Sequence, residues 1–85
     1  MIIRQSDEIM VEAQDVTTIF RFGIMRTLEG FKVALRINCG EFYKPITRDF
    51  DSFNEAYKVF ASSITSVLDY EKINPHTKVT VIRMR

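Results

Sequence analysis

The sequence has few of the residues on which disulfides, metal sites and nucleotide-binding loops depend. Its 85 residues include one cysteine, one histidine, three glycines, two prolines and no tryptophan. Cys39 has no partner for an intramolecular disulfide, and three dispersed glycines do not make a phosphate-binding loop. His76 follows a proline in a predicted loop, and Cys39 lies in a predicted turn with no histidine near it in sequence, so neither is expected to be catalytic. We therefore expect a protein that is not an enzyme and holds neither a metal ion nor a cofactor.

Long hydrophobic runs are also missing. No apolar stretch approaches the roughly 18 residues of a membrane-spanning helix, and the first residues lack the apolar core of a secretory signal. Hydrophobic residues nevertheless make up 46% of the chain, which argues against disorder. We expect one small domain, residues 1–85, in a reducing cytoplasm and without membrane contact.

The middle of the chain predicts a strand, a tight turn and a second strand. From Phe31 to Asn38, apolar residues occupy every second position, which is typical of a strand with one buried face. A two-residue turn at Cys39–Gly40 would pair Leu35 with Lys44 and Val33 with Ile46, and it would keep the apolar sides together. A three-residue loop with Gly40 as a bulge residue stays open as an alternative.

A long amphipathic helix is predicted to follow this hairpin. Asp51 or Ser52 can cap its first turn, and Ser52–Glu55 fits a capping box. Apolar residues then recur at helical spacing and form one broad stripe that needs a sheet to cover. Residues Ile73–His76 end the helix, because proline disfavours helical backbone at the residue before it.

Strands are predicted on both sides of this central unit. Val16–Met25 is one, and a four-residue connection, Arg26–Glu29, would pair Ile24 with Phe31, Phe22 with Val33 and Phe20 with Leu35. Thr77–Met84 is expected to be a final strand with Val79 and Val81 inward. Residues 1–15 fit an edge strand at Met1–Ile3, followed by either a helical turn or, as we prefer, a strand with Ile9, Val11 and Ala13 inward.

The predicted fold is therefore α+β, an antiparallel sheet of four to five strands with one long amphipathic helix on one face, in the order β(β)ββαβ. The expected core combines residues of the sheet and of the helix: Phe20, Phe22, Val33, Leu35, Ile37, Phe42 and Ile46 against Phe53, Tyr57, Phe60, Ile64 and Leu68.

Charge is nearly balanced overall, at +1, but it is segregated along the chain. The predicted hairpin region is basic and the helix is acidic, which is informative about partners. The outer face of the sheet would carry Arg21, Lys32, Arg36 and Tyr43 as candidate binding residues, with Ile19 and Met25 as candidate interface residues. Three interpretations of this face stay open: a solvated face, a nucleic-acid platform and a protein interface.

The hairpin and the helix start resemble a known kind of DNA-binding domain. Residues 30–44 followed by 49–56, with Phe53, Glu55 and Ala56 at the helix start, are similar to the three-stranded-sheet-plus-helix domains of the AP2 type and of phage integrase arm-binding domains. The resemblance covers about residues 30–56. It implies a sheet laid in the DNA major groove and a phage or prophage origin. The acidic helix start and the additional terminal strands depart from that pattern.

Two functions follow as expectations. The first is a small non-enzymatic protein-interaction module or inhibitor that self-associates as a homodimer through the sheet face or an edge strand. The second is a small DNA-binding domain that uses the basic outer face of the sheet.

Overall fold

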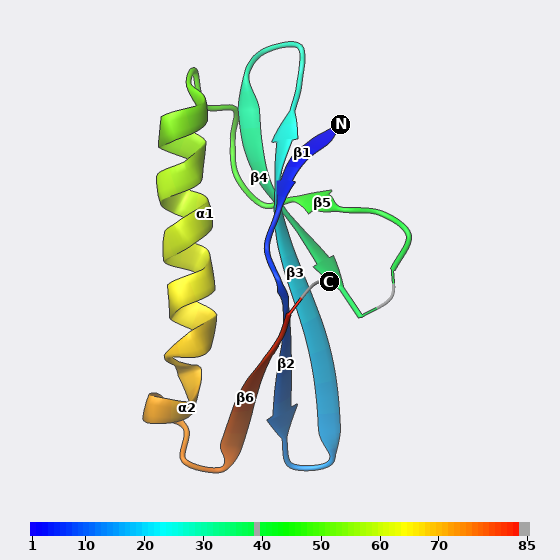
Figure 1. The fold of residues 1–85 in the computed structure, drawn as a ribbon, viewed down its shortest axis with the longest axis vertical. Coiled ribbons are helices and arrows are strands. Elements are labelled where there is room, and N and C mark those ends of the chain that lie inside the picture. The colour runs from blue at the N-terminus through cyan, green and yellow to red at the C-terminus, as the bar shows by residue number, and fades with distance from the viewer. Residues whose placement is uncertain (39, 84–85) are drawn as a thin grey trace.

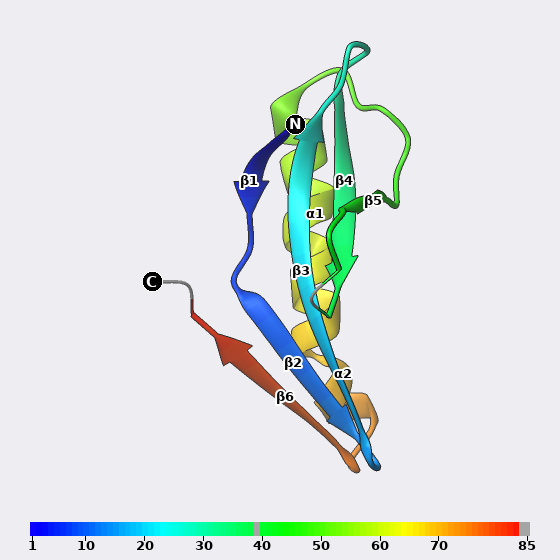
Figure 2. The ribbon, with the colours of Figure 1, turned by 90° about the vertical axis from the view of Figure 1, so that its right-hand side faces the viewer.

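The computed structural model describes residues 1–38 and 40–83 and has the predicted α+β architecture. One antiparallel sheet is covered on one face by α1 (Figure 1; Figure 2). Within the described residues the sheet has six strands, because the N-terminal residues form two strands and the segment after the turn contributes a short one. The elements in chain order are β1 (Ile2–Gln5), β2 (Glu8–Ala13), β3 (Val16–Arg26), β4 (Phe31–Ile37), β5 (Lys44–Pro45), α1 (Phe53–Leu68), α2 (Tyr70–Ile73) and β6 (Thr77–Ile82).

Strand β3 is the spine of the sheet. It pairs with β4 along one edge, and along the other edge it pairs with both β2 and β1, within a strand order of β5-β4-β3-β2-β6. Ser6 joins β1 to β2: its backbone N–H donates to the Phe22 carbonyl at 2.9 Å, and its hydroxyl accepts from the Phe22 N–H at 2.9 Å. Strands β1 and β2 therefore act as one long, interrupted strand beside β3.

The helix begins as the sequence predicts. Ser52 is the N-cap residue, and its hydroxyl oxygen accepts a hydrogen bond from the backbone N–H of Glu55 at 3.2 Å. This bond satisfies one of the amides that lack an intrahelical partner. After Leu68 the short helix α2 leads into the turn at Asn74–His76, so the predicted stop near Pro75 is confirmed.

The core lies between α1 and the inner face of the sheet, which is the face turned toward α1. Ala56 and Phe60 of α1 are buried against residues of the three central strands, namely Ile9, Phe22, Ile24 and Val33. Ile9 and Val11 point inward from β2, so the strand interpretation of this segment is confirmed.

The predicted pairing of β3 with β4 is displaced by two residues. Ile24 pairs with Val33, Phe22 with Leu35 and Phe20 with Ile37. The connection is still four residues long, but it runs from Thr27 to Gly30, because Arg26 continues the strand and pairs with Phe31. A shift of two residues leaves every side chain on its predicted face, since side chains alternate with a period of two.

On the other side of β4, the predicted register is correct but the strand is shorter than expected. Leu35 pairs with Lys44, and the Ile46 N–H donates to the Val33 carbonyl at 2.9 Å. Strand β5 consists of Lys44–Pro45 alone. The form of the turn at Cys39 and the end of the last strand at Met84 lie outside the described residues.

Several predicted core residues are exposed. Phe42 is 76% exposed, Ile37 50%, Ile46 49% and Tyr57 39%, and Val81, expected to point inward, is 42% exposed. The sheet is wider than the single helix that covers it, so an apolar residue on the inner face is buried only where α1 lies over it. Tyr57 is on α1 itself, with its ring beside Arg4 of β1. Among the described residues, no helix is long and apolar enough to cross a membrane.

Candidate functional site

The outer face of the sheet, turned away from α1, brings the predicted binding residues together. Arg21 and Arg36 are directly opposite each other on β3 and β4, and Lys32 lies farther along β4. Each of the three has a partner within the protein. Arg21 Nη2 lies 3.2 Å from a Glu8 carboxylate oxygen, Lys32 Nζ lies 3.8 Å from Asp49, and the Arg36 guanidinium lies 5.6 Å from the centre of the Tyr43 ring.

Tyr43 covers the middle of this face. A Cβ built on Gly23 would lie 3.0 Å from Tyr43 Cε1, so the ring occupies the space that glycine leaves open. Ala34, opposite Gly23, is fully buried as a result. Within the described residues, the Tyr43 hydroxyl and the Nε atoms of Arg21 and Arg36 are buried without a hydrogen-bond partner, so packing and the arginine–ring contact hold this cover in place.

The two predicted interface residues are only partly available. Ile19 and Met25 are half-buried on the outer face, near opposite ends of β3. Met25 pairs with Lys32 and, on its other side, with Ile2. The Ile19 N–H donates to the Asn38 side-chain oxygen at 3.1 Å. The sequence therefore predicted correctly which residues lie on the outer face. It did not predict that Tyr43 covers the middle of that face.

A first exposed apolar surface lies on the inner face at the β5 edge of the sheet. We call Ile37, Phe42 and Ile46 the β4–β5 apolar patch. Beside this patch is a hollow of about 290 Å³, lined by Leu35, Ile37, Gly40, Glu41, Phe42 and Lys44. Glu41 and Lys44 give the hollow one charge of each sign. The helix does not reach this part of the sheet, so three large apolar side chains face solvent.

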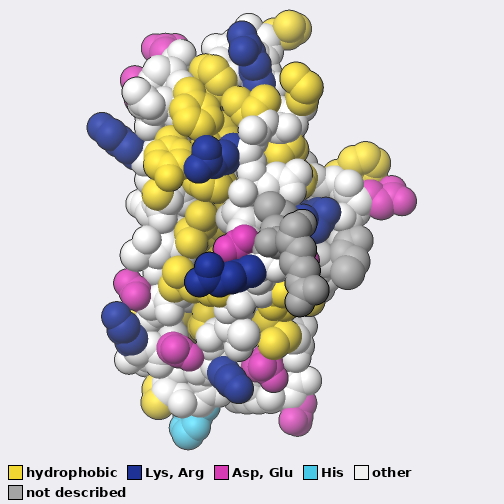
Figure 3. Space-filling model, viewed as in Figure 1, with side chains coloured by type: hydrophobic (Ala, Val, Ile, Leu, Met, Phe, Trp, Pro, Cys, Tyr) yellow, Lys and Arg dark blue, Asp and Glu magenta, His cyan; other side chains and the backbone are white. Residues whose placement is uncertain are grey.

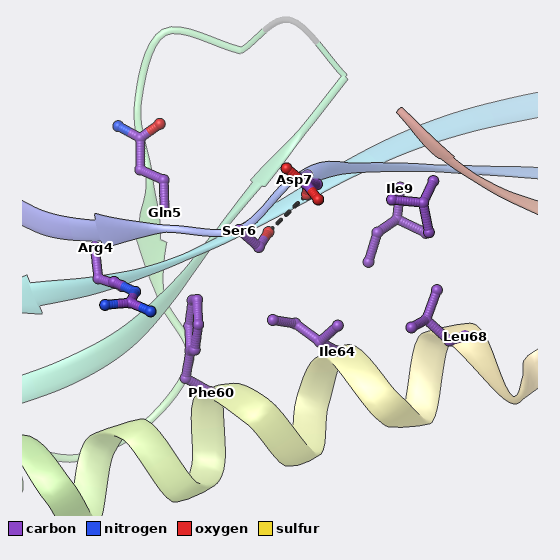
Figure 4. Close-up of a pocket in the computed structure, with 9 residues that line it drawn as sticks. Arg4, Gln5, Ser6, Asp7, Ile9, Phe60, Ile64 and Leu68 are labelled. Carbon is purple, nitrogen blue, oxygen red and sulfur yellow. Dashed lines mark hydrogen bonds between the residues drawn. The ribbon is translucent and has the colours of Figure 1, made fainter. Parts of the chain in front are cut away.

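A second surface lies at the opposite edge, between β1 and α1, and we call it the β1–α1 groove. Strand β6 pairs with β2 as far as Glu8 and pairs with none of the described residues of β1. Near the end of β6, a cavity of about 310 Å³ opens between the β1–β2 strands and α1 (Figure 4). It is lined by Arg4, Gln5, Ser6, Asp7 and Ile9 from the strands, Phe60, Ile64 and Leu68 from α1, and Val81 from β6.

A row of aromatic rings continues the groove toward the start of α1. Phe31, Phe53, Tyr57 and Phe60 follow one another with ring centres 5.8–6.0 Å apart. Arg4 lies 5.5 Å from the centre of the Tyr57 ring, and Arg26 lies 5.7 Å from that of Phe31. Figure 3 shows hydrophobic side chains gathered between α1 and β1, with basic side chains among them.

Sequence reasoning did not identify this groove. Arg4 lies in residues 1–15, for which the sequence leaves two structures open, and Tyr57 and Phe60 are predicted as core residues alone. The signal that could have found it was the length of the strands: β1 and β2 together match the long β3, whereas the last strand is too short to cover both.

Comparisons with known proteins do not identify a family for this chain. No protein-family model matches the chain, and searches of curated proteins and of solved structures found no significant match. The resemblance to AP2-type and integrase arm-binding domains stays a prediction. Among residues 1–38 and 40–83, no group of three or more potential metal ligands lies together.

Proposed function

We propose that this chain is a non-enzymatic protein-interaction module that self-associates through the β4–β5 apolar patch. The observation that carries the proposal is the exposure of the patch itself: Ile37 is 50%, Phe42 76% and Ile46 49% exposed. The total area of the chain leaves room for an interface of ordinary size. The chain exposes 6090 Å², whereas a folded monomer of 9.9 kDa exposes about 5200 Å² by the usual scaling with mass. The excess of about 900 Å² is close to the roughly 800 Å² that each partner contributes to a standard protein interface.

The patch suits a contact between two copies. Its apolar centre is flanked by Glu41 and Lys44, so a two-fold contact can place each charge opposite its complement in the other copy. Phe42 is well suited as a central anchor, because large aromatic side chains dominate interface energetics.

Replacing Phe42 with glutamate is expected to convert a dimer into a monomer. The substitution removes the aromatic ring of the patch and would bury an unpaired carboxylate in the contact. The dissociation constant of the dimer should therefore rise by at least about tenfold. Size exclusion with light scattering at about 100 µM measures the mass directly. Leu28→Glu is the matched control, since Leu28 is fully exposed in the β3–β4 connection, outside the patch, and its replacement should leave the dimer intact.

A monomeric mass for the unchanged chain at that concentration would exclude this function. If the Phe42 and Leu28 substitutions changed the measured mass equally, the interface would not be at the β4–β5 apolar patch.

The DNA-binding alternative stays a prediction and has its own test. Arg21, Lys32 and Arg36 would each have to exchange a protein partner for a phosphate. Three such contacts give a slope of about −3 in the logarithm of affinity against the logarithm of salt concentration, and Arg36→Gln should reduce it by about one. Lys58→Gln, on the exposed side of α1, should leave the slope unchanged. Absence of duplex binding at about 50 mM salt would contradict the alternative.

A further inference from the structure

The β1–α1 groove combines an open strand edge with an apolar cavity. A strand directs the backbone groups of alternate residues to opposite edges, and β1 pairs with β3 along one edge alone within the described part of the chain. Its other edge therefore presents backbone donors and acceptors without a strand partner. The open edge is in line with β6, which fills the same position beside β2 (Figure 2).

The cavity beside this edge can accept apolar side chains. Figure 4 shows Phe60, Ile64 and Leu68 extending from α1 toward the strand that carries Ser6 and Ile9. The volume of the cavity, about 310 Å³, lies at the lower end of the range for ligand pockets, about 300–1,000 Å³. A strand added to the edge would turn every second side chain toward this cavity.

The charges of the lining differ along the groove: Asp7 lies beside Ser6, where β1 passes into β2, and Arg4 lies nearer the start of β1 (Figure 4). An acidic residue of a bound segment is therefore favoured at the Arg4 end. Arg4 lies at the rim of the cavity, contacts the Tyr57 ring and forms no ion pair with any described residue. The β1 strand of a second copy would bring another arginine to this rim, and like charges on paired strands repel. An acidic residue in a different polypeptide would instead meet an unpaired guanidinium.

We propose that the β1–α1 groove binds an extended, acidic-apolar peptide segment of another protein by strand addition to β1. The added segment runs antiparallel to β1, as all the paired strands of the sheet do. It continues the direction of β6, so it passes the cavity first and Arg4 afterwards. The recognised pattern is therefore an apolar residue followed two positions later by an aspartate or glutamate.

Random heptapeptides displayed on phage, selected against the full chain, test this inference. We expect enrichment of the apolar-x-acidic pattern. The strongest peptide, made synthetically with a fluorescent label, should lose at least about tenfold in affinity against Arg4→Glu and be unaffected by Lys58→Glu, because Lys58 lies on the exposed side of α1. A version of the peptide with lysine in place of its acidic residue should prefer the Arg4→Glu protein.

The backbone contribution needs its own readout. Methylating the peptide nitrogens of one set of alternate residues should abolish binding, whereas methylating the other set should not, because only one edge of the added strand faces β1. Lack of an enriched pattern, insensitivity to Arg4→Glu, or equal effects of both methylated sets would each overturn the proposal.

Self-association through the β4–β5 apolar patch is tested separately. Phe42→Glu should leave peptide binding intact, and Arg4→Glu should leave the dimer mass intact, so either proposal can fail alone. Concentration-dependent protection of the β1 amides from hydrogen exchange in the peptide-free protein would show a second copy on this edge and would overturn the peptide assignment.

Discussion

Replacing Phe60 with alanine is expected to lower the free energy of unfolding by about 3–5 kcal/mol, the usual range for a buried phenylalanine. Phe60 is 4% exposed and packs between α1 and the inner face of the sheet, with Ile9, Phe22 and Ile24 in the same cluster. Removal of its ring leaves a cavity that the paired strands cannot close by moving together. Urea denaturation followed by circular dichroism measures the change.

Leu28→Ala is the control for this prediction. It also truncates a large apolar side chain, but at a fully exposed position outside the β4–β5 apolar patch, so it should cost less than about 1 kcal/mol. A Phe60→Ala cost below about 1 kcal/mol would contradict the packing of α1 described above.

Replacing Gly30 with alanine is expected to destabilise the fold by about 2–4 kcal/mol. Gly30 has φ of +151°, which side-chain-bearing residues rarely adopt, and a Cβ there would collide with the Phe50 carbonyl oxygen. That carbonyl accepts the Phe31 N–H at 2.9 Å, and the Phe50 N–H returns a bond to the Phe31 carbonyl at 2.7 Å. The substitution therefore forces apart the chain segments that fix the edge of β4.

Gly40→Ala tests whether glycine loss alone explains the effect. Its Cβ would lie 3.2 Å from the Ile37 carbonyl oxygen at an exposed position, so the expected cost is below about 1 kcal/mol. Thermal unfolding of both variants under the same conditions gives the comparison. Similar melting temperatures for the two would remove the steric role assigned to Gly30.

The helix and the alternation of the strands could be predicted because both depend on neighbouring residues. Ser52 and Glu55 are close enough in sequence for the cap to be recognised, and it forms as predicted. The face on which Phe22 and Val33 lie follows from their spacing alone. The predicted register between β3 and β4 was wrong by two residues, because an arginine at position 26 is compatible both with a turn and with the end of a strand.

Coverage of the sheet could not be predicted from spacing. Alternation places Phe42 and Ile46 on the inner face, but whether a helix lies over them depends on the path of α1 across the sheet. The cover of the outer face by Tyr43 is also a tertiary feature. The β1–α1 groove depends on β2 and β6 meeting from opposite ends of the chain, a pairing that no local pattern encodes.

The pairing of β6 with β2 also sets the order in which the chain can assemble. The β2–β3 and β3–β4 hairpins pair strands that are adjacent in sequence. The pairing of Ala13 with Thr77, in contrast, joins residues from opposite ends of the chain. Closing so long a loop is slow in entropic terms, so the hairpins and α1 should be in place before β6 arrives. Until then the edge of β2 is open along its whole length, and at high protein concentration it is the site where one folding chain would capture another.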